Sequence, residues 1–255
     1  MDNALLVGLS RQVTLSRELE VVANNLANIN TTGYKADSSI FEQFLMPEAS
    51  ADGFPPDSRE LAYVRDRATW HKFAPGPTQR TGGTLDVAID GDAFLVVQTA
   101  AGQRYTRNGA LQISPTGTLV TTAGDPVLGV GGPIQFQNSD HDISIGEDGT
   151  ITVREGASAT SDSTRGQLQL AHFDNAGALQ KEGSSLFSAP AGVAPQPPQN
   201  VRVVQGAIEQ SNVSAVAEMA RMIEITRAYE SIAGLLQQEN TERISALDKL
   251  AAVPA

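Results

Sequence analysis

The sequence contains no cysteine, and this absence removes several kinds of chemistry. Disulfide bonds, thiolate catalysis and cysteine-based zinc sites are all excluded. Aromatic residues make up only 5% of the chain, so the core must be built from Val, Ile, Leu and Ala. No apolar run approaches the roughly 18 residues that a membrane-spanning helix needs, so we expect no direct membrane span.

Positive charge is also scarce, with 18 Lys and Arg against 29 Asp and Glu. Most of the negative excess lies between residues 36 and 205, and no basic stripe is present. Because phosphate contacts need clustered Lys and Arg, we expect no binding to nucleic acid. The N-terminus lacks the basic and apolar regions of a cleaved signal peptide. The expected location is therefore cytoplasmic, unless export proceeds without a cleaved signal.

A first helix is predicted over residues 3–28. Its apolar side chains Leu15, Leu19, Val22 and Leu26 are spaced by four, three and four residues, which is the seam of a coiled coil. The helix should end within residues 28–33, since Asn and Thr compete for backbone hydrogen bonds there. Gly33 is expected to adopt a positive φ at this end.

A second, longer helix is predicted over residues 212–250, with Ser211-Asn212 as its N-cap. Its seam is spaced by three, four, three and four residues and consists of Met222, Ile225, Tyr229, Ile232 and Leu236. At about 1.5 Å per residue, this helix would span nearly 60 Å. Isolated helices are marginal in water, so the two seams must be buried against each other, against other subunits, or both. The length of the second helix favours packing between subunits.

The middle of the chain has the pattern of β structure. Residues 36–79, interrupted by Pro47, Pro55 and Pro56, are predicted to be a connector with short strands. Residues 80–205 show turn signals about every 8–12 residues, typical of a sandwich or barrel-like domain. The expected fold class is α+β, with helical assembly segments over residues 1–35 and 206–255.

No pattern of residues indicates catalysis. His71, His141 and His172 occur in unrelated segments, without the spacing of a metal site. The Asp-Gly pairs at residues 90–91 and 148–149 suit tight turns and do not continue into a calcium loop. Phosphate-binding and nucleophile-elbow motifs are missing as well. We therefore expect no cofactor, no metal and no enzymatic activity.

Five segments carry a resemblance to a known family. Residues 22–35, VANNLANINTTGYK, and residues 205–213, QGAIEQSNV, resemble the N- and C-terminal signatures of bacterial flagellar rod and hook proteins. Between them, LDVAIDG at residues 85–91, YTRNG at residues 105–109 and GTLVT at residues 117–121 are similar to blocks of the rod proteins that carry a β domain. One departure is Ala93, where the family usually has glycine.

The resemblance implies a structural subunit of the rod that crosses the periplasm. It implies export by the flagellar type III apparatus and assembly with other rod proteins and with copies of itself. Length and the MDNA start are most similar to proximal-rod members, and distal-rod members are the main alternative. Together, the seams and signatures predict these assembly residues: Leu15, Leu19, Val22, Asn24, Asn25, Leu26, Asn28, Gly33, Tyr34, Gly206, Glu209, Ser211, Asn212, Val213, Met222, Ile225, Tyr229, Ile232 and Leu236.

Two functions of other classes stay open. An adhesin or carbohydrate-binding β module should show clustered aromatics on the β domain, but the only tryptophan, Trp70, lies outside residues 80–205. An enzyme with a carboxylate pair would need a deep pocket with raised carboxylate pKa values.

Overall fold

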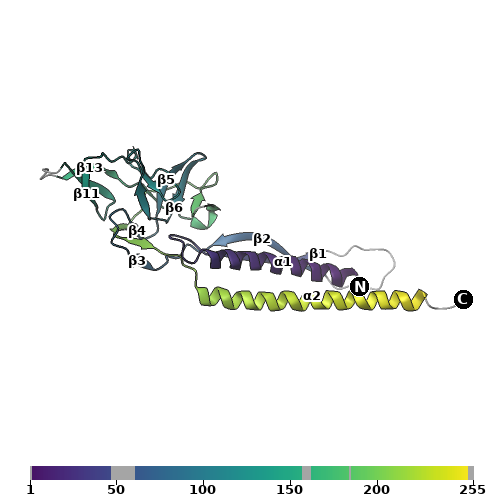
Figure 1. Cartoon of the computed structure of the whole chain (residues 1–255). Helices are drawn as coiled ribbons and strands as arrows, with labels where there is room; N and C mark the ends of the chain where they lie inside the picture. The colour runs from purple at the N-terminus through teal and green to yellow at the C-terminus, as the bar shows by residue number, and fades with distance from the viewer. Residues whose placement is uncertain (1, 47–60, 157–161, 184, 252–255) are drawn as a thin grey trace. The chain divides into compact units, whose positions relative to one another are not determined.

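The computed structural model describes residues 2–46, 61–156, 162–183 and 185–251 (Figure 1). The described residues fall into two units. The helical unit lies within residues 1–27, 37–70 and 214–255, and the β unit consists of residues 28–36 and 71–213. These boundaries differ from those expected from the sequence, since residues 28–36 belong with the β structure and residues 37–70 belong with the helices.

The helical unit contains two long helices that lie side by side (Figure 1). Helix α1 spans Asp2–Ala27 and helix α2 spans Ala215–Ala251. They run antiparallel, because Gly8 of α1 meets Leu236 of α2 while Glu18 accepts hydrogen bonds from Arg221 at 2.7 and 3.0 Å. Strands β1 (Asp37–Met46) and β2 (Leu61–His71) pair with each other in a two-stranded sheet.

The predicted seams meet each other in this helix pair. Leu15, Val22 and Ile225 are buried at the contact. The partly buried side chains that pack against them include Leu19, Met222, Ala228, Tyr229 and Ile232. Of the arrangements that the sequence left open, the structure shows packing within one chain.

Helix α2 is longer than its partner, with 37 residues against 26. Every side chain at residues 241–249 is exposed. The predicted N-cap at Ser211-Asn212 is wrong, because α2 begins at Ala215 and the amide of Glu218 donates to the carbonyl of Ser214. Coiled-coil geometry beyond this apolar contact stays a prediction.

The β unit is built from small antiparallel sheets. Its strands are β3 (Thr78–Arg80), β4 (Val87–Asp90), β5 (Phe94–Thr99), β6 (Gly102–Thr106), β7 (Leu111–Ile113), β8 (Leu119–Thr121), β9 (Leu128–Gly129), β10 (Gly132–Pro133), β11 (Asp140–Ile145), β12 (Thr150–Glu155), β13 (Asp162–Gln167), β14 (Leu170–Ala171), β15 (Gln180–Glu182), β16 (Leu186–Ser188), β17 (Arg202–Gln205) and β18 (Ala207–Glu209). A 3-10 turn, η1, covers Ala176–Ala178.

The largest sheet has the order β14-β5-β6-β16-β15, and a three-stranded sheet has the order β11-β12-β13. Two-stranded pairs join β17 to β4, β18 to β3, β7 to β8 and β10 to β9. Among the described residues no sheet closes on itself, so the barrel-like alternative is not found. The mostly β character predicted for the middle is confirmed.

The core of the β unit depends on aliphatic side chains, as the low aromatic content predicted. Its main cluster includes Leu95, Val97, Leu119, Ile151 and Val203. A second cluster contains Phe94, Tyr105, Phe173 and Phe187. His71 is buried against Phe187, with ring centroids 5.9 Å apart.

The expectation of short strands in the connector is wrong. Strands β1 and β2 have 10 and 11 residues. The prolines Pro47, Pro55 and Pro56 lie outside the described residues.

We predict that the helix contact stabilises the isolated subunit. Replacing Ile225 by Ala should lower the free energy of unfolding of the helical unit by about 2–4 kcal/mol, because it leaves a cavity against Leu15 and Val22. Urea unfolding followed by helical circular dichroism measures this loss. Ser231→Ala, on an exposed position of the same helix, is the control and should be nearly neutral. Equal effects of the two variants would contradict a buried contact.

Candidate assembly site: a buried charge cluster joining the signature segments

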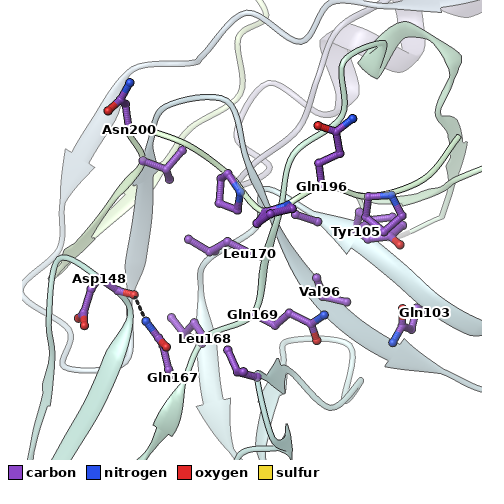
Figure 2. Close-up of a pocket in the computed structure, with 16 residues that line it drawn as sticks. Val96, Gln103, Tyr105, Asp148, Gln167, Leu168, Gln169, Leu170, Gln196 and Asn200 are labelled. Atoms are coloured by element: carbon purple, nitrogen blue, oxygen red, sulfur yellow. Dashed lines mark hydrogen bonds between the residues drawn. The ribbon is translucent and has the colours of Figure 1, made fainter.

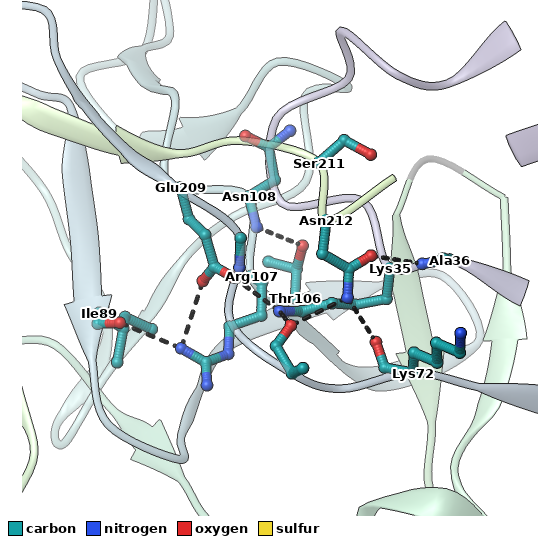
Figure 3. A network of polar contacts seen from close by, with 12 residues as sticks. Lys35, Ala36, Lys72, Ile89, Thr106, Arg107, Asn108, Glu209, Ser211 and Asn212 are labelled. Atoms are coloured by element: carbon teal, nitrogen blue, oxygen red, sulfur yellow. Dashed lines mark hydrogen bonds and ion pairs between the residues drawn. The ribbon is translucent and has the colours of Figure 1, made fainter. Parts of the chain in front are cut away.

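Glu209, at the end of β18, contacts charged residues from two other segments of the chain (Figure 3). Its Oε1 accepts a hydrogen bond from Lys35 Nζ at 2.6 Å and another from the Gly76 amide at 2.9 Å. Its Oε2 lies 3.3 Å from Arg107 Nη1. Lys35, Arg107 and Glu209 are all buried. We call these three side chains the charge cluster.

The cluster holds two cations and one anion, and carbonyl oxygens accept further hydrogen bonds from the cations, although Arg107 Nε is buried without a partner among the described residues. Lys35 donates to the carbonyl of Ala74 at 2.9 Å. Arg107 donates to the carbonyls of Ile89 at 3.1 Å and Gly91 at 2.6 Å. Burial lowers the pKa values of Lys35 and Arg107, and the charge of Glu209 opposes both shifts. The Glu209 carboxylate therefore offsets much of the free-energy cost of burying two cations.

Gly33 allows the N-terminal segment to approach this cluster. Its φ is +67°, as predicted, and its amide donates to the backbone carbonyl of Glu209 at 2.7 Å. A Cβ at this position would lie 2.4 Å from the carbonyl carbon of Arg107 and from the Asn108 amide. Both backbone conformation and close packing thus require glycine here.

Asn212 joins the two signatures a second time. Its Oδ1 accepts from the Ala36 amide at 2.8 Å, and its Nδ2 donates to the carbonyls of Lys72 and Ala74 at 2.8 and 2.9 Å (Figure 3). Both polar atoms of the side chain are therefore used in the β unit, which explains why it does not cap α2. Nearby, Lys181 Nζ lies 3.6 Å from the ring centroid of buried Tyr34 and donates to the carbonyl of Lys35.

The other predicted signature residues shape the backbone. In the helical unit, buried Asn25 exchanges two hydrogen bonds of 2.8 Å with the backbone of Asp37. Asn28 accepts a hydrogen bond from the hydroxyl of Thr31. Gly206 has a φ of +75°, and its carbonyl accepts from two amides of the turn after β3.

The remaining predicted residues take smaller parts. Ser211 Oγ accepts from the Val213 amide at 3.3 Å, forming a local turn before α2. Asn24 is exposed, and Leu26 is partly buried near the end of α1. Leu236 packs over Gly8, where an added Cβ would lie 2.8 Å from Leu236 Cδ2.

Lys35, Arg107 and Gly76 were missed as site residues. A signal for them was available in the sequence. Each of three family-like segments contains a single charged residue among apolar and turn-forming neighbours. These residues are Lys35 after Gly33-Tyr34, Arg107 in YTRNG and Glu209 in QGAIE. Sequence alone does not pair them, because Lys35 and Glu209 are 174 positions apart.

The arrangement of the site is suited to holding segments together. Among the residues that the structure describes, no three His, Asp or Glu side chains gather as metal ligands. Within the same residues, no helix is both long and apolar enough to cross a membrane.

We predict that Glu209→Gln will destabilise the β unit by about 3–5 kcal/mol, because it leaves Lys35 and Arg107 buried without a negative partner. Chemical unfolding of the whole chain measures this loss. The matched control is Glu182→Gln, which removes an ion pair with Arg104 on the protein surface and should cost no more than about 1 kcal/mol. Similar losses for both variants would show that the cluster does not hold the fold.

Comparison with known proteins matches the same three segments. Residues 5–35 match the family described as flagella basal body rod protein. Residues 88–153 match the D1 domain of flagellar hook proteins FlgE/F/G, and residues 204–241 match the C-terminal region of flagellar basal body rod FlgEFG proteins. Each match contributes one charge of the cluster: Lys35, Arg107 and Glu209, respectively.

Curated relatives extend the similarity over nearly the whole chain. The flagellar basal-body rod protein FlgF of Caulobacter vibrioides is 41% identical, with 96% of each chain covered. FlgF of Rhizobium meliloti is 34% identical, with 98% of each chain covered. FlgG of Bacillus subtilis is 33% identical over 91% of this chain and 92% of its own. The chain therefore belongs to the family of flagellar basal-body rod proteins, as a structural, non-enzymatic subunit that is more similar to FlgF than to FlgG.

Proposed function

We propose that this chain is a subunit of the proximal rod, the part of the axial shaft that transmits torque across the periplasm. It polymerises through its two helices with copies of itself and with other rod proteins. Delivery by the flagellar type III export apparatus, without a cleaved signal peptide, belongs to the same proposal. The main observation in support of this proposal is that both helices keep exposed apolar side chains outside their contact with each other.

Helix α2 has a second apolar stripe besides its seam. Val216, Met219 and Ile223 are spaced by three and four residues, so they share one face, and each is exposed by between 46% and 76%. Helix α1 has a matching pair, Leu9 and Val13, which are exposed by 54% and 63%. We call these two sets the outer stripes.

Further exposed apolar side chains lie toward the end of α2, at Leu235, Ile244 and Leu247. Burying one Leu, Ile, Val or Met side chain contributes about 1.5–3 kcal/mol, so the outer stripes could supply repeated contacts along a polymer. The seams are used within the chain, so the outer stripes and the exposed end of α2 are the surfaces left for neighbours. Packing of these surfaces between subunits would give the coiled-coil contacts expected from the sequence.

The stripes on α1 and α2 are different surfaces, which determines the kind of assembly. When one surface of a subunit contacts a different surface of the next, the contact does not close on itself unless the rotation generates a ring. Such heterologous contacts build open helical filaments, as a shaft requires.

A distal-rod subunit is the alternative position in the same assembly. It is supported by the FlgG relative of Bacillus subtilis, which aligns over nearly the same length as the FlgF relatives. Both positions use the same helical surfaces, so the test below examines polymerisation itself.

We predict that Met219→Asp combined with Ile223→Asp will block incorporation into the rod and leave the monomer folded. Both positions are exposed, so the free energy of unfolding should change by no more than about 0.5 kcal/mol per substitution. The measurement is the amount of the subunit in purified basal bodies, together with swimming in soft agar, in cells that lack the native copy. Helical circular dichroism of the purified variant confirms that it is folded.

The matched control is Ser231→Asp, which adds a charge at another exposed position of α2 and should assemble normally. Detection of each variant outside the cytoplasm separates a failure to assemble from a failure of export. Normal basal-body content of the double variant would overturn the role of the α2 outer stripe.

A further inference from the structure

A pocket with a mixed apolar and polar lining lies within the β unit, beside its largest sheet where β14 forms the edge (Figure 2). Its volume is about 650 Å³. One side is the sheet surface around Val96 and Tyr105, which are direct cross-strand neighbours on β5 and β6. Gln169 joins them from the segment before β14, because its carbonyl accepts from the Val96 amide at 3.2 Å. Pro195, Pro197 and Pro198 also line the pocket.

Beside its apolar side chains, the lining carries a set of polar groups that are mostly neutral. Gln103, Gln167, Gln169, Gln196 and Asn200 contribute side-chain amides, and Tyr105 contributes a phenol (Figure 2). Each amide can both donate and accept hydrogen bonds. The lining therefore matches a ligand that presents hydroxyl or amide groups.

Two of these amides are already oriented. Gln167 Nε2 donates to the carbonyl of Asp148 at 2.9 Å, and Gln196 Nε2 donates to Asp174 Oδ2 at 2.6 Å. Their Oε1 atoms are left as fixed acceptors. By contrast, the side chains of Gln103 and Gln169 and the hydroxyl of Tyr105 make no hydrogen bond with other residues that the structure describes. These three groups are available to a ligand.

The strand edge beside the pocket is too short to accept a peptide as an added strand. His172 and Gln196 exchange backbone hydrogen bonds of 2.8 and 2.9 Å, and the Leu168 amide donates to Gly149. Only the segment around Leu170 lies between these paired positions. Recognition through an added strand needs several consecutive free backbone groups, so the pocket favours a ligand held by side chains.

Charge restricts the ligand further. Asp148 is the only ionisable acid or base among the lining residues other than the Tyr105 phenol. Hydrogen bonds from the hydroxyl and the amide of Thr150 lower the pKa of the Asp148 carboxyl, which keeps this residue negative. An anionic ligand is therefore disfavoured, while an uncharged one is not.

We propose that this pocket binds a neutral saccharide, with Gln103, Gln169 and Tyr105 donating to and accepting from its hydroxyl or acetamido groups. The apolar surfaces of the prolines pack against the ring carbons. The Tyr105 ring is buried against Phe173, so it provides no open stacking surface and affinity rests on hydrogen bonds. This inference does not depend on polymerisation of the helices.

The test is a titration of the ¹⁵N-labelled full chain with the trimer of N-acetylglucosamine, and separately with maltotriose, followed by the side-chain amide signals in NMR spectra. We expect saturable shifts of the Gln103 and Gln169 amide signals with at least one sugar. Gln169→Ala, and Tyr105→Phe, which removes only the hydroxyl, should each weaken binding about three- to tenfold, as expected for one lost hydrogen bond. Gln180→Ala on β15, at the other edge of the sheet, is the control and should bind normally.

Absence of saturable shifts with both sugars at tens of millimolar would overturn the proposal. Equal affinity of the wild type and the two pocket variants would do so as well, because binding would then lie elsewhere. Tetraglycine with an acetylated N-terminus and an amidated C-terminus, which is uncharged, provides the third arm. If it shifts the same signals at lower concentration than either sugar, the pocket is a peptide site.

Discussion

The buried carboxylate of Glu209 is the contact on which the β unit depends. It lies between two cations, Lys35 from the N-terminal signature and Arg107 from the segment after β6, and its own backbone carbonyl accepts a hydrogen bond from the Gly33 amide. A buried group of ions adds little net stability compared with apolar side chains of the same volume. It does, however, strongly disfavour any chain arrangement that leaves one of its charges buried without a partner. Its main effect is specificity, since only one pairing of the two chain ends neutralises both Lys35 and Arg107.

Sequence reasoning predicted the elements whose signals are local. The spacing of the apolar side chains located both helices to within a few residues. The regular turn signals, Asp-Gly pairs among them, indicated the mostly β character of the middle of the chain. The positive φ of Gly33 was also predictable, because it follows Asn and Thr at a helix end. Each of these features is determined by residues that are close together in the chain.

The features that were missed depend on distant partners. Ser211-Asn212 has the residue types of an N-cap, but Asn212 bonds to Ala36, Lys72 and Ala74, and α2 begins later. The seams matched a coiled coil in spacing, yet spacing does not say whether the partner helix belongs to the same chain. Lys35 could not be paired with Glu209 by any local rule. In each case a tertiary contact overrode or completed a local preference.

The ion pair between Lys35 and Glu209 also makes the intervening 174-residue span a closed loop. The entropy of closing a loop grows only with the logarithm of its length, so doubling the span would cost about 0.6 kcal/mol more. Extra residues at a turn such as Gly124, where nothing lies within 4 Å of an added Cβ, would leave the closure intact. The middle of the chain can therefore change in size over evolution while the two signatures continue to meet at the same carboxylate.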